Sequence, residues 1–401
     1  MMPLRIVVAP SGFKECLSAE AVARAIGRGI RAAAPDAQIV ELPLVDGGEG
    51  FARALVELTD GVHRLSTVRG PLGDPVEAAW GFLGGEHVAT AVIDMASAAG
   101  LRLVPADRRD PLATSTYGVG QLIRTALDAG ARRILIGCGD SGTNDAGSGM
   151  ADALGVRLLD RNRRAIRPGG AGLLDLADID MAGLDKRLAT TTIEVACNIE
   201  NVLLGPRGVA PVFGPQKGAS PDAVHFLEMG LENFAARSAD ATGVDVAAMP
   251  GAGASGGLGA GLAAFLGARL CPRYDILARF IDLDAHFAQA DLIFTAEGGL
   301  DGQSARGKIP AEVGRRAQTL GIPVVALAGT IGTEAALLRD HGIGAFFSTV
   351  PAPCELAHAM AAADGHLERC AENVMRTFIM SMQVAMTAMA RGAFAPSLTR
   401  Q

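Results

Sequence analysis

The chain has 401 residues, which is too long for one ordinary hydrophobic core, so two domains are expected. Its formal net charge is −7 and it contains no run of Lys or Arg, which excludes a typical nucleic-acid-binding protein. No apolar stretch is long and charge-free enough to predict a membrane span, and six singly scattered cysteines are typical of reduced thiols in a cytoplasmic protein.

Short β-like runs alternate with helical patterns along the chain. A strand is predicted over 4–10, followed by a helix over 19–33 for which Ser18 provides an N-cap. Further strands are predicted, in chain order, over 38–45, 88–95, 133–137, 155–159, 192–197, 210–213, 291–295, 323–328 and 345–350. A Met-rich helix that packs against the core is expected over 374–390. This alternation favours an α/β fold with parallel sheets, in which ligands bind at the carboxyl ends of the strands.

The loops that follow these strands are rich in glycine and charged residues. Six of them stand out, at residues 10–15, 46–50, 137–147, 214–218, 251–257 and 297–308. Glycines bring backbone N–H groups close to a phosphate, carboxylates hold Mg²⁺, and lysines neutralise a transferring phosphoryl group. Together the loops predict chemistry on a phosphorylated nucleotide.

A dinucleotide-dependent oxidoreductase is the alternative. Gly137, Gly139 and Gly142 fit the pattern G-x-G-x-x-G after a predicted strand, and the next strand ends at Asp160, as an NAD-binding unit requires. Against it, the carboxylate of Asp145 would lie near the pyrophosphate without a cation. The Walker A order is absent from the sequence.

In their order along the chain, the loops resemble the bacterial type I glycerate kinase family (glycerate 2-kinase-like). The resemblance runs from Ile6 to about Val350 and is carried by residues 13–15, 17–19, 46–50, 141, 143–145, 212–219, 250–254, 256–261, 297–298, 300–303 and 307–308. It implies ATP-dependent, Mg²⁺-requiring phosphorylation of D-glycerate, usually giving 2-phosphoglycerate. The small hydroxy-acid is then the partner of the protein, with no nucleic acid and no membrane.

The resemblance also implies two α/β domains, one of them discontinuous and Rossmann-like, with the active site in the cleft between them. We place the Rossmann-like domain at 1–75 and 286–401 and the inserted α/β domain at 76–285. The loops around Lys14, Asp46, Glu297 and Asp301 are then expected in the same domain.

Roles for individual residues follow from the chemistry that phosphoryl transfer needs. The expected catalytic residues are Lys14, Asp46, Asp145 and Lys217, with Asp145 acting on the substrate hydroxyl. The expected nucleotide contacts are Ser141, Asn144, Gly253, Ser255, Gly256, Gly257 and Lys308. The expected Mg²⁺ ligands are Asp46, Glu297 and Asp301.

Three positions depart from the family pattern. Ser11 and Asn198 stand where the family usually has Asp, and Gly299 stands where it has Arg. Two carboxylates and one guanidinium are therefore missing from loops of the expected active site. A short hydroxy-acid other than glycerate is an alternative substrate on this ground.

Overall fold

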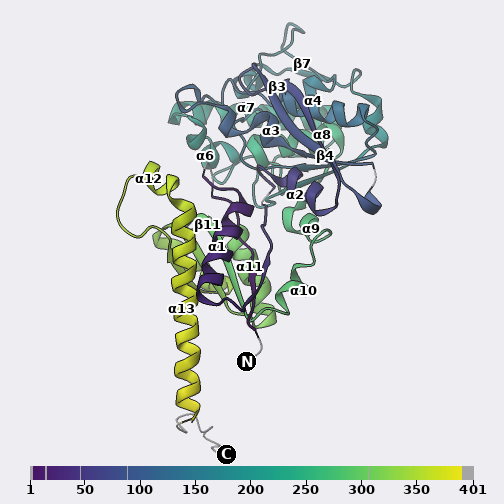
Figure 1. The fold of residues 1–401 in the computed structure, drawn as a ribbon. Coiled ribbons are helices and arrows are strands. Elements are labelled where there is room, and N and C mark those ends of the chain that lie inside the picture. Colours follow the sequence, from purple (N-terminus) through teal and green to yellow (C-terminus); the bar gives the residue numbers. More distant parts are fainter. Residues whose placement is uncertain (1–2, 14–15, 46, 88, 306, 391–401) are drawn as a thin grey trace, which may run out of the picture. The chain divides into compact units, whose positions relative to one another are not determined.

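The computed structural model describes residues 3–13, 16–45, 47–87, 89–305 and 307–390. Its contacts divide the chain into two units (Figure 1). One comprises the residues up to Leu44 together with those from Asp282 onward, and the other is Val45–Ile281. Lys14 and Asp46, two of the expected catalytic residues, lie outside the described residues. None of the helices described combines the length and the apolar character needed to cross a bilayer.

The first unit is built on a five-stranded parallel sheet in the order β13-β12-β11-β1-β2. Its strands are β1 (Arg5–Val8), β2 (Gln38–Glu41), β11 (Leu292–Leu300), β12 (Val324–Ile331) and β13 (Ile343–Ser348). Its helices are α1 (Ala19–Ala33), α10 (Leu283–Phe287), α11 (Ile309–Leu320), α12 (Leu356–Ala361) and α13 (Ala363–Ala390), with a 3₁₀ segment at Thr333–His341. This α/β architecture confirms the predicted fold class.

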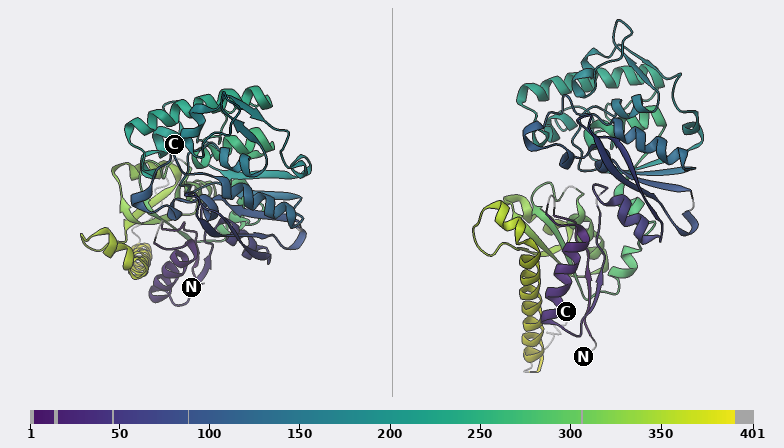
Figure 2. Two further views of the ribbon diagram at one scale, coloured as in Figure 1. Left: turned by 90° about the horizontal axis from the view of Figure 1, so that it is seen from above. Right: turned by 45° about the horizontal axis from the view of Figure 1, so that its top comes forward.

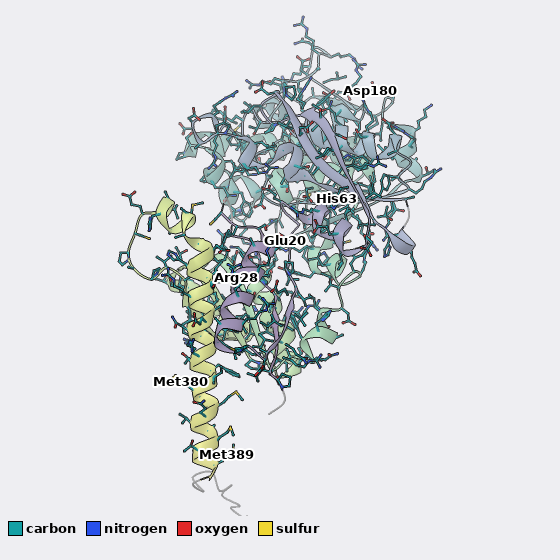
Figure 3. All side chains as sticks on the ribbon, viewed as in Figure 1. Glu20, Arg28, His63, Asp180, Met380 and Met389 are labelled. Atoms are coloured by element: carbon teal, nitrogen blue, oxygen red, sulfur yellow. The ribbon has the colours of Figure 1, made fainter. Side chains whose placement is uncertain are left out.

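Helices α1 and α13 lie side by side in this unit, as both views of Figure 2 show. Close approach is possible because Gly29 has no side chain; a Cβ there would meet the Glu368 carbonyl oxygen at 2.1 Å. Arg28 pairs with Asp364 at 2.6 Å and with Glu368 at 2.7 Å. The packing role expected for the Met-rich helix holds only for its first part, because Met380 and Met389, farther along the helix, are exposed (Figure 3).

The second unit contains a six-stranded mixed sheet in the order β10-β9-β6-β5-β4-β3. Its strands are β3 (Val62–Arg69), β4 (Pro75–Phe82), β5 (Thr90–Asp94), β6 (Arg133–Gly137), β9 (Thr192–Cys197) and β10 (Arg269–Pro272), and a separate hairpin is formed by β7 (Arg157–Leu159) and β8 (Asp178–Asp180). Its helices are α2 (Phe51–Leu58), α3 (Met95–Ala99), α4 (Tyr117–Asp128), α5 (Ser148–Ala153), α6 (Val209–Phe213), α7 (Pro221–Thr242), α8 (Ala254–Leu266) and α9 (Arg273–Leu277). The 3₁₀ segments are Gly85–His87, Leu101–Leu103, Ala106–Arg108, Gly170–Asp175, Lys186–Thr190 and Pro215–Lys217. Strands β5, β6, β9 and β10 are parallel, so their carboxyl ends share one edge of the sheet.

The first crossing between the units lies at 44/45 and not at the expected residue 75. Strand pairing is the reason: β3 pairs with β4 along its whole length and β4 pairs with β5, so this segment completes the second sheet. The loop Gly47–Gly50 therefore belongs to a different unit from Glu297 and Asp301, contrary to expectation. The second crossing, after Ile281, lies four residues before the expected start at 286.

Two predicted strands are wrong in kind or in place. Residues 210–213 belong to helix α6, where Pro211 lies in the first turn and its missing N–H costs no hydrogen bond. Residues 157–159 form a strand, but it pairs antiparallel with β8 in the hairpin. The second parallel strand of a dinucleotide-binding unit is therefore not formed there, which removes the structural basis of the oxidoreductase alternative.

Candidate functional site

The loop after β6 is held in shape by Asp145. This fully buried carboxylate accepts hydrogen bonds from Thr116 N at 2.8 Å, from Thr116 Oγ1 at 2.9 Å, and from the N–H groups of Gly147 and Gly149 at 3.2 Å each. Burial raises the pKa of Asp145, and the hydrogen bonds oppose that rise. Since both oxygens are engaged, these contacts favour a positioning role for Asp145, and its role as the catalytic base stays a prediction.

Lys217 reaches the same loop from the 3₁₀ turn Pro215–Lys217. Its side chain is buried, and Nζ donates to Ser141 Oγ at 2.9 Å and to the Thr143 carbonyl oxygen at 2.6 Å. Burial lowers the pKa of Lys217 to about 7, and the charge of Asp145 opposes this effect. The structure thus joins Ser141 and Lys217, which are far apart in sequence. An ammonium has three N–H donors, so one remains for a ligand when the group is charged.

Asn144 is fully buried between these groups. Neither its Oδ1 nor its Nδ2 has a hydrogen-bond partner, and neither does Oγ1 of the adjacent, equally buried Thr143. Buried polar atoms without partners are rare, because each costs about 1–3 kcal/mol. A carboxamide offers both a donor and an acceptor, so Asn144 suits the oxygen atoms of a phosphate or of a hydroxy-acid.

The glycine-rich turn at the start of α8 packs directly on this loop. Gly256 O accepts a hydrogen bond from Ala146 N at 3.1 Å, and a Cβ on Gly256 would meet the Thr143 carbonyl oxygen at 1.9 Å. Ser255, Gly256 and Gly257 have φ values of 53°, 70° and 85°, so regular helical geometry begins only after them. Gly253 is closely packed against a different segment, since an added Cβ there would lie 2.1 Å from the Val202 carbonyl oxygen. Gly256 and Gly257 therefore serve close backbone packing that shapes the loop after β6, which we call the Asn144 loop.

Asp94 was missed by sequence reasoning. It ends β5, next to β6, and accepts hydrogen bonds from Gly50 N at 2.9 Å and from Ala52 N at 2.5 Å, so that it holds the start of α2. Burial raises the pKa of Asp94 to about 7, and the nearby charges of Glu49 and Asp140 raise it further against these hydrogen bonds. A carboxylate that directly ends an apolar strand was the available signal.

In the first unit, Glu297 lies near the end of β11 and Asp301 directly follows this strand. Glu297 pairs with Lys308 Nζ at 2.8 Å and accepts a hydrogen bond from Ser304 Oγ at 2.8 Å. Asp301 accepts from Gln303 N at 2.8 Å and Ser304 N at 3.1 Å, and lies 4.0 Å from Lys308 Nζ. Lys308, expected to contact the nucleotide, is thus placed between the two expected metal ligands at the start of α11.

These carboxylates meet part of what Mg²⁺ requires. Across the described residues, no three His, Cys, Asp or Glu side chains come together as a metal site. A Mg²⁺ ion that arrives with a nucleotide needs only one or two protein carboxylates, since phosphate oxygens and water fill its other positions. Glu297 and Asp301 fit that limited role, with Lys308 as the charge that the ion would displace.

The three departures from the family pattern fall in both units. Ser11 follows β1, where its Oγ donates to the Ala296 carbonyl oxygen at 3.0 Å, and Gly299 lies on the neighbouring β11. A Cβ on Gly299 would meet only Thr330 Oγ1, at 2.8 Å, so a side chain fits if that hydroxyl rotates. Asn198 follows β9 in the second unit.

Comparison with known proteins agrees with this architecture. The sequence pattern described as the Glycerate kinase family matches residues 6–379. A glycerate kinase of Bacillus subtilis is 45% identical over 371 residues, which cover 92% of this chain and 97% of that protein. A glycerate 2-kinase of Escherichia coli is 44% identical over 382 residues, covering 95% and 100%.

A solved structure is similar as well. The crystal structure of a protein from Salmonella typhimurium LT2, assigned as glycerate kinase 2, superimposes with a TM-score of 0.75 at 44% identity and covers 95% of this chain and 100% of that one. Family pattern, sequence identity and fold all span nearly the whole chain. The chain therefore belongs to the glycerate kinase family.

Proposed function

We propose that this kinase transfers the γ-phosphoryl group of ATP to the 2-hydroxyl of D-glycerate, giving 2-phosphoglycerate. The observation that carries the proposal is the match to the glycerate kinase family over residues 6–379. The 2-position is taken from the name of the E. coli relative. The partnerless amide of buried Asn144 supports it from the structure, because it offers hydrogen bonds that a small polar ligand can complete.

In this proposal Asn144 and Lys217 bind oxygen atoms of the reacting molecules. Asp145 acts through Thr116 and the glycine N–H groups, and keeps the loop of Asn144 in one shape. Lys217 fixes the Thr143 carbonyl oxygen and keeps one N–H donor for the negative charge that moves during transfer. A rigid arrangement of this kind lowers the barrier chiefly by positioning.

Glu297 and Asp301 would hold Mg²⁺ on the ATP phosphates, where the ion neutralises negative charge. Ser304 keeps the Glu297 carboxylate oriented, and Lys308 balances both carboxylates before the ion arrives. We expect full activity to depend on all three charged side chains.

A different short hydroxy-acid is the second candidate substrate. Gly299 favours it, since a residue without a side chain leaves room beside Glu297 and lacks the positive charge of the Arg that the family usually has there.

A coupled assay of ADP release with ATP and a panel of C3 and C4 hydroxy-acids tests both proposals. We expect the highest kcat/KM with D-glycerate and no turnover when Mg²⁺ is chelated. A higher kcat/KM for another acid would select the second candidate. Absence of ADP release with every acid would refute the proposed activity.

A further inference from the structure

A group of three arginines surrounds one glutamate at the amino ends of the parallel strands in the second unit. Glu194 lies on β9 and its side chain is fully buried. Arg133 on β6, Arg269 on β10 and Arg279 after α9 all pair with it, Arg133 Nε at 2.9 Å and Arg279 Nη1 at 2.9 Å and 3.0 Å from its carboxylate oxygens. We call these four residues the arginine cluster.

The arginine cluster carries an excess of positive charge. Burial alone would raise the pKa of Glu194, but hydrogen bonds from Arg269, Arg133 and Arg279 outweigh it and lower that pKa to about 2. Glu194 is therefore ionised at any working pH, and three guanidiniums against one carboxylate leave a net charge of +2. Within the described residues, no second carboxylate lies within 4.0 Å of the three guanidiniums.

Most of the hydrogen-bonding capacity of the arginine cluster is unused. A guanidinium has five N–H donors, whereas Arg269 and Arg279 each contact Glu194 through a single nitrogen. The side chains of Arg133, Arg269 and Arg279 are 42%, 65% and 36% exposed, so their remaining donors are open to a ligand. The buried carboxylate holds the three groups close together in spite of their mutual repulsion.

A small cavity lies beside two of the arginines. It has a volume of about 30 Å³ and is lined by His87, Thr90, Arg133, Leu135, Arg279 and Phe280. Its size suits a single oxygen atom or water molecule rather than a whole ligand. A bound anion would lie on the exposed guanidinium edges of Arg133 and Arg279 beside this cavity, whose surface is mainly apolar.

We propose that the arginine cluster binds a compact oxyanion with two or more negative charges, either a phosphoryl group or a short polycarboxylate. Planar guanidinium forks match both kinds of oxygen pair, and such charge-assisted contacts are the strong ones. The site is separate from the candidate active site, because Glu194 and the arginines lie at the amino ends of strands whose carboxyl ends carry the Asn144 loop. The bound anion is thus an effector and not the kinase substrate.

The position of the arginine cluster also suits an effector. Strand β6 runs from Arg133 directly into the Asn144 loop, so one strand joins the arginine cluster to the candidate site. Arg279 lies three residues before Asp282, where the chain passes into the first unit.

Isothermal titration calorimetry of the full chain with inorganic phosphate, pyrophosphate and citrate, at constant ionic strength set with chloride, tests the proposal. We expect at least one of these anions to bind the wild type, and the double variant Arg269→Gln/Arg279→Gln to bind it about tenfold more weakly or worse. The single variant Arg269→Gln leaves Glu194 paired with two arginines, and serves if the double variant does not fold by circular dichroism.

Two controls separate binding at the arginine cluster from binding elsewhere on the protein. Arg187→Gln removes an arginine of similar exposure, 45%, that is already neutralised by Asp128 and Asp185, and Lys217→Met alters the candidate active site. Both should retain the binding that the Arg269 and Arg279 variants lose, whatever additional binding at the candidate active site Lys217→Met removes. The proposal is overturned if no probe binds the wild type, if the Arg269 and Arg279 variants bind unchanged, or if either control weakens binding equally. None of these readouts depends on kinase activity.

Discussion

Gly256 offers a sharp test of how the glycine turn serves the candidate site. A Cβ at this position would lie 1.9 Å from the Thr143 carbonyl oxygen, whereas real Cβ atoms essentially never come closer than 3.0 Å. In Gly256→Ala the two must therefore separate by about 1.1 Å (3.0 minus 1.9), and we expect the Thr143 oxygen to retreat toward the loop of Asn144 and away from Lys217. The same oxygen accepts the hydrogen bond from Lys217 Nζ at 2.6 Å. A retreat of this size takes the contact beyond hydrogen-bonding distance.

The cost has three parts. The positive φ of 70° costs an alanine about 1 kcal/mol, overpacking costs about 1–3 kcal/mol, and loss of a hydrogen bond to a charged group costs about 1.5–3 kcal/mol. We expect the free energy of unfolding to fall by about 3.5–7 kcal/mol, the sum of the three parts. We also expect kcat to fall about 100-fold, because a misplacement of about 1 Å in a catalytic arrangement can cost that factor.

Gly267 provides the matched control. It ends the same helix with a φ of 61°, and a Cβ there would meet nothing within 4 Å. Gly267→Ala therefore carries the conformational cost of about 1 kcal/mol without the collision, and its kcat should be that of the wild type. Urea unfolding and the ADP-release assay on both variants decide the matter. Equal unfolding free energies for the two variants, or wild-type kcat in Gly256→Ala, would refute the reasoning.

Four further predictions concern single side chains. The pKa of Lys217 is 10.5 in the unfolded chain and about 7 in the folded protein. Between pH 7 and 10.5 the stability of the wild type should therefore rise with pH relative to Lys217→Met. Urea titrations measure this difference, and a difference that does not change with pH would contradict the prediction. For Asp94 the order is reversed, because its pKa of about 7 in the folded protein exceeds the value of 3.8 in the unfolded chain. The stability of the wild type should therefore fall relative to Asp94→Asn as pH rises from about 4 to 7. A rise in stability would contradict the burial of this carboxylate. Glu297→Gln should raise the Mg²⁺ concentration for half-maximal ADP release about tenfold with the melting temperature unchanged, since one charged ligand is lost; an unchanged Mg²⁺ requirement would exclude Glu297 as a ligand. Gly299→Arg should fold normally, because only the Thr330 hydroxyl must move, and should raise kcat/KM for glycerate; a lower value would show that the glycine is needed.

Local elements could be predicted because they depend on neighbours in the sequence. The helix Ala19–Ala33 with its Ser18 cap and the strands Arg133–Gly137 and Thr192–Cys197 have the bounds that the sequence predicts. In each case the apolar spacing or the capping side chain acts within a few residues. Strand pairing is different, since the apolar pattern of residues 157–159 is the same in a parallel sheet and in the hairpin that it forms.

The sequence by itself determined the α/β class and the family, because these rest on residue types and their order along the chain. The loops that it indicates for the chemistry remain a prediction. Only the tertiary structure decided which side chains meet. Lys217 contacts Ser141, 76 residues away in the sequence, and Gly50 contacts Asp94, 44 residues away. Glu194 pairs with arginines 61, 75 and 85 residues away. Such contacts depend on which strands pair, and the shifted pKa values depend on burial. Both are properties of the packed chain that no local sequence pattern contains.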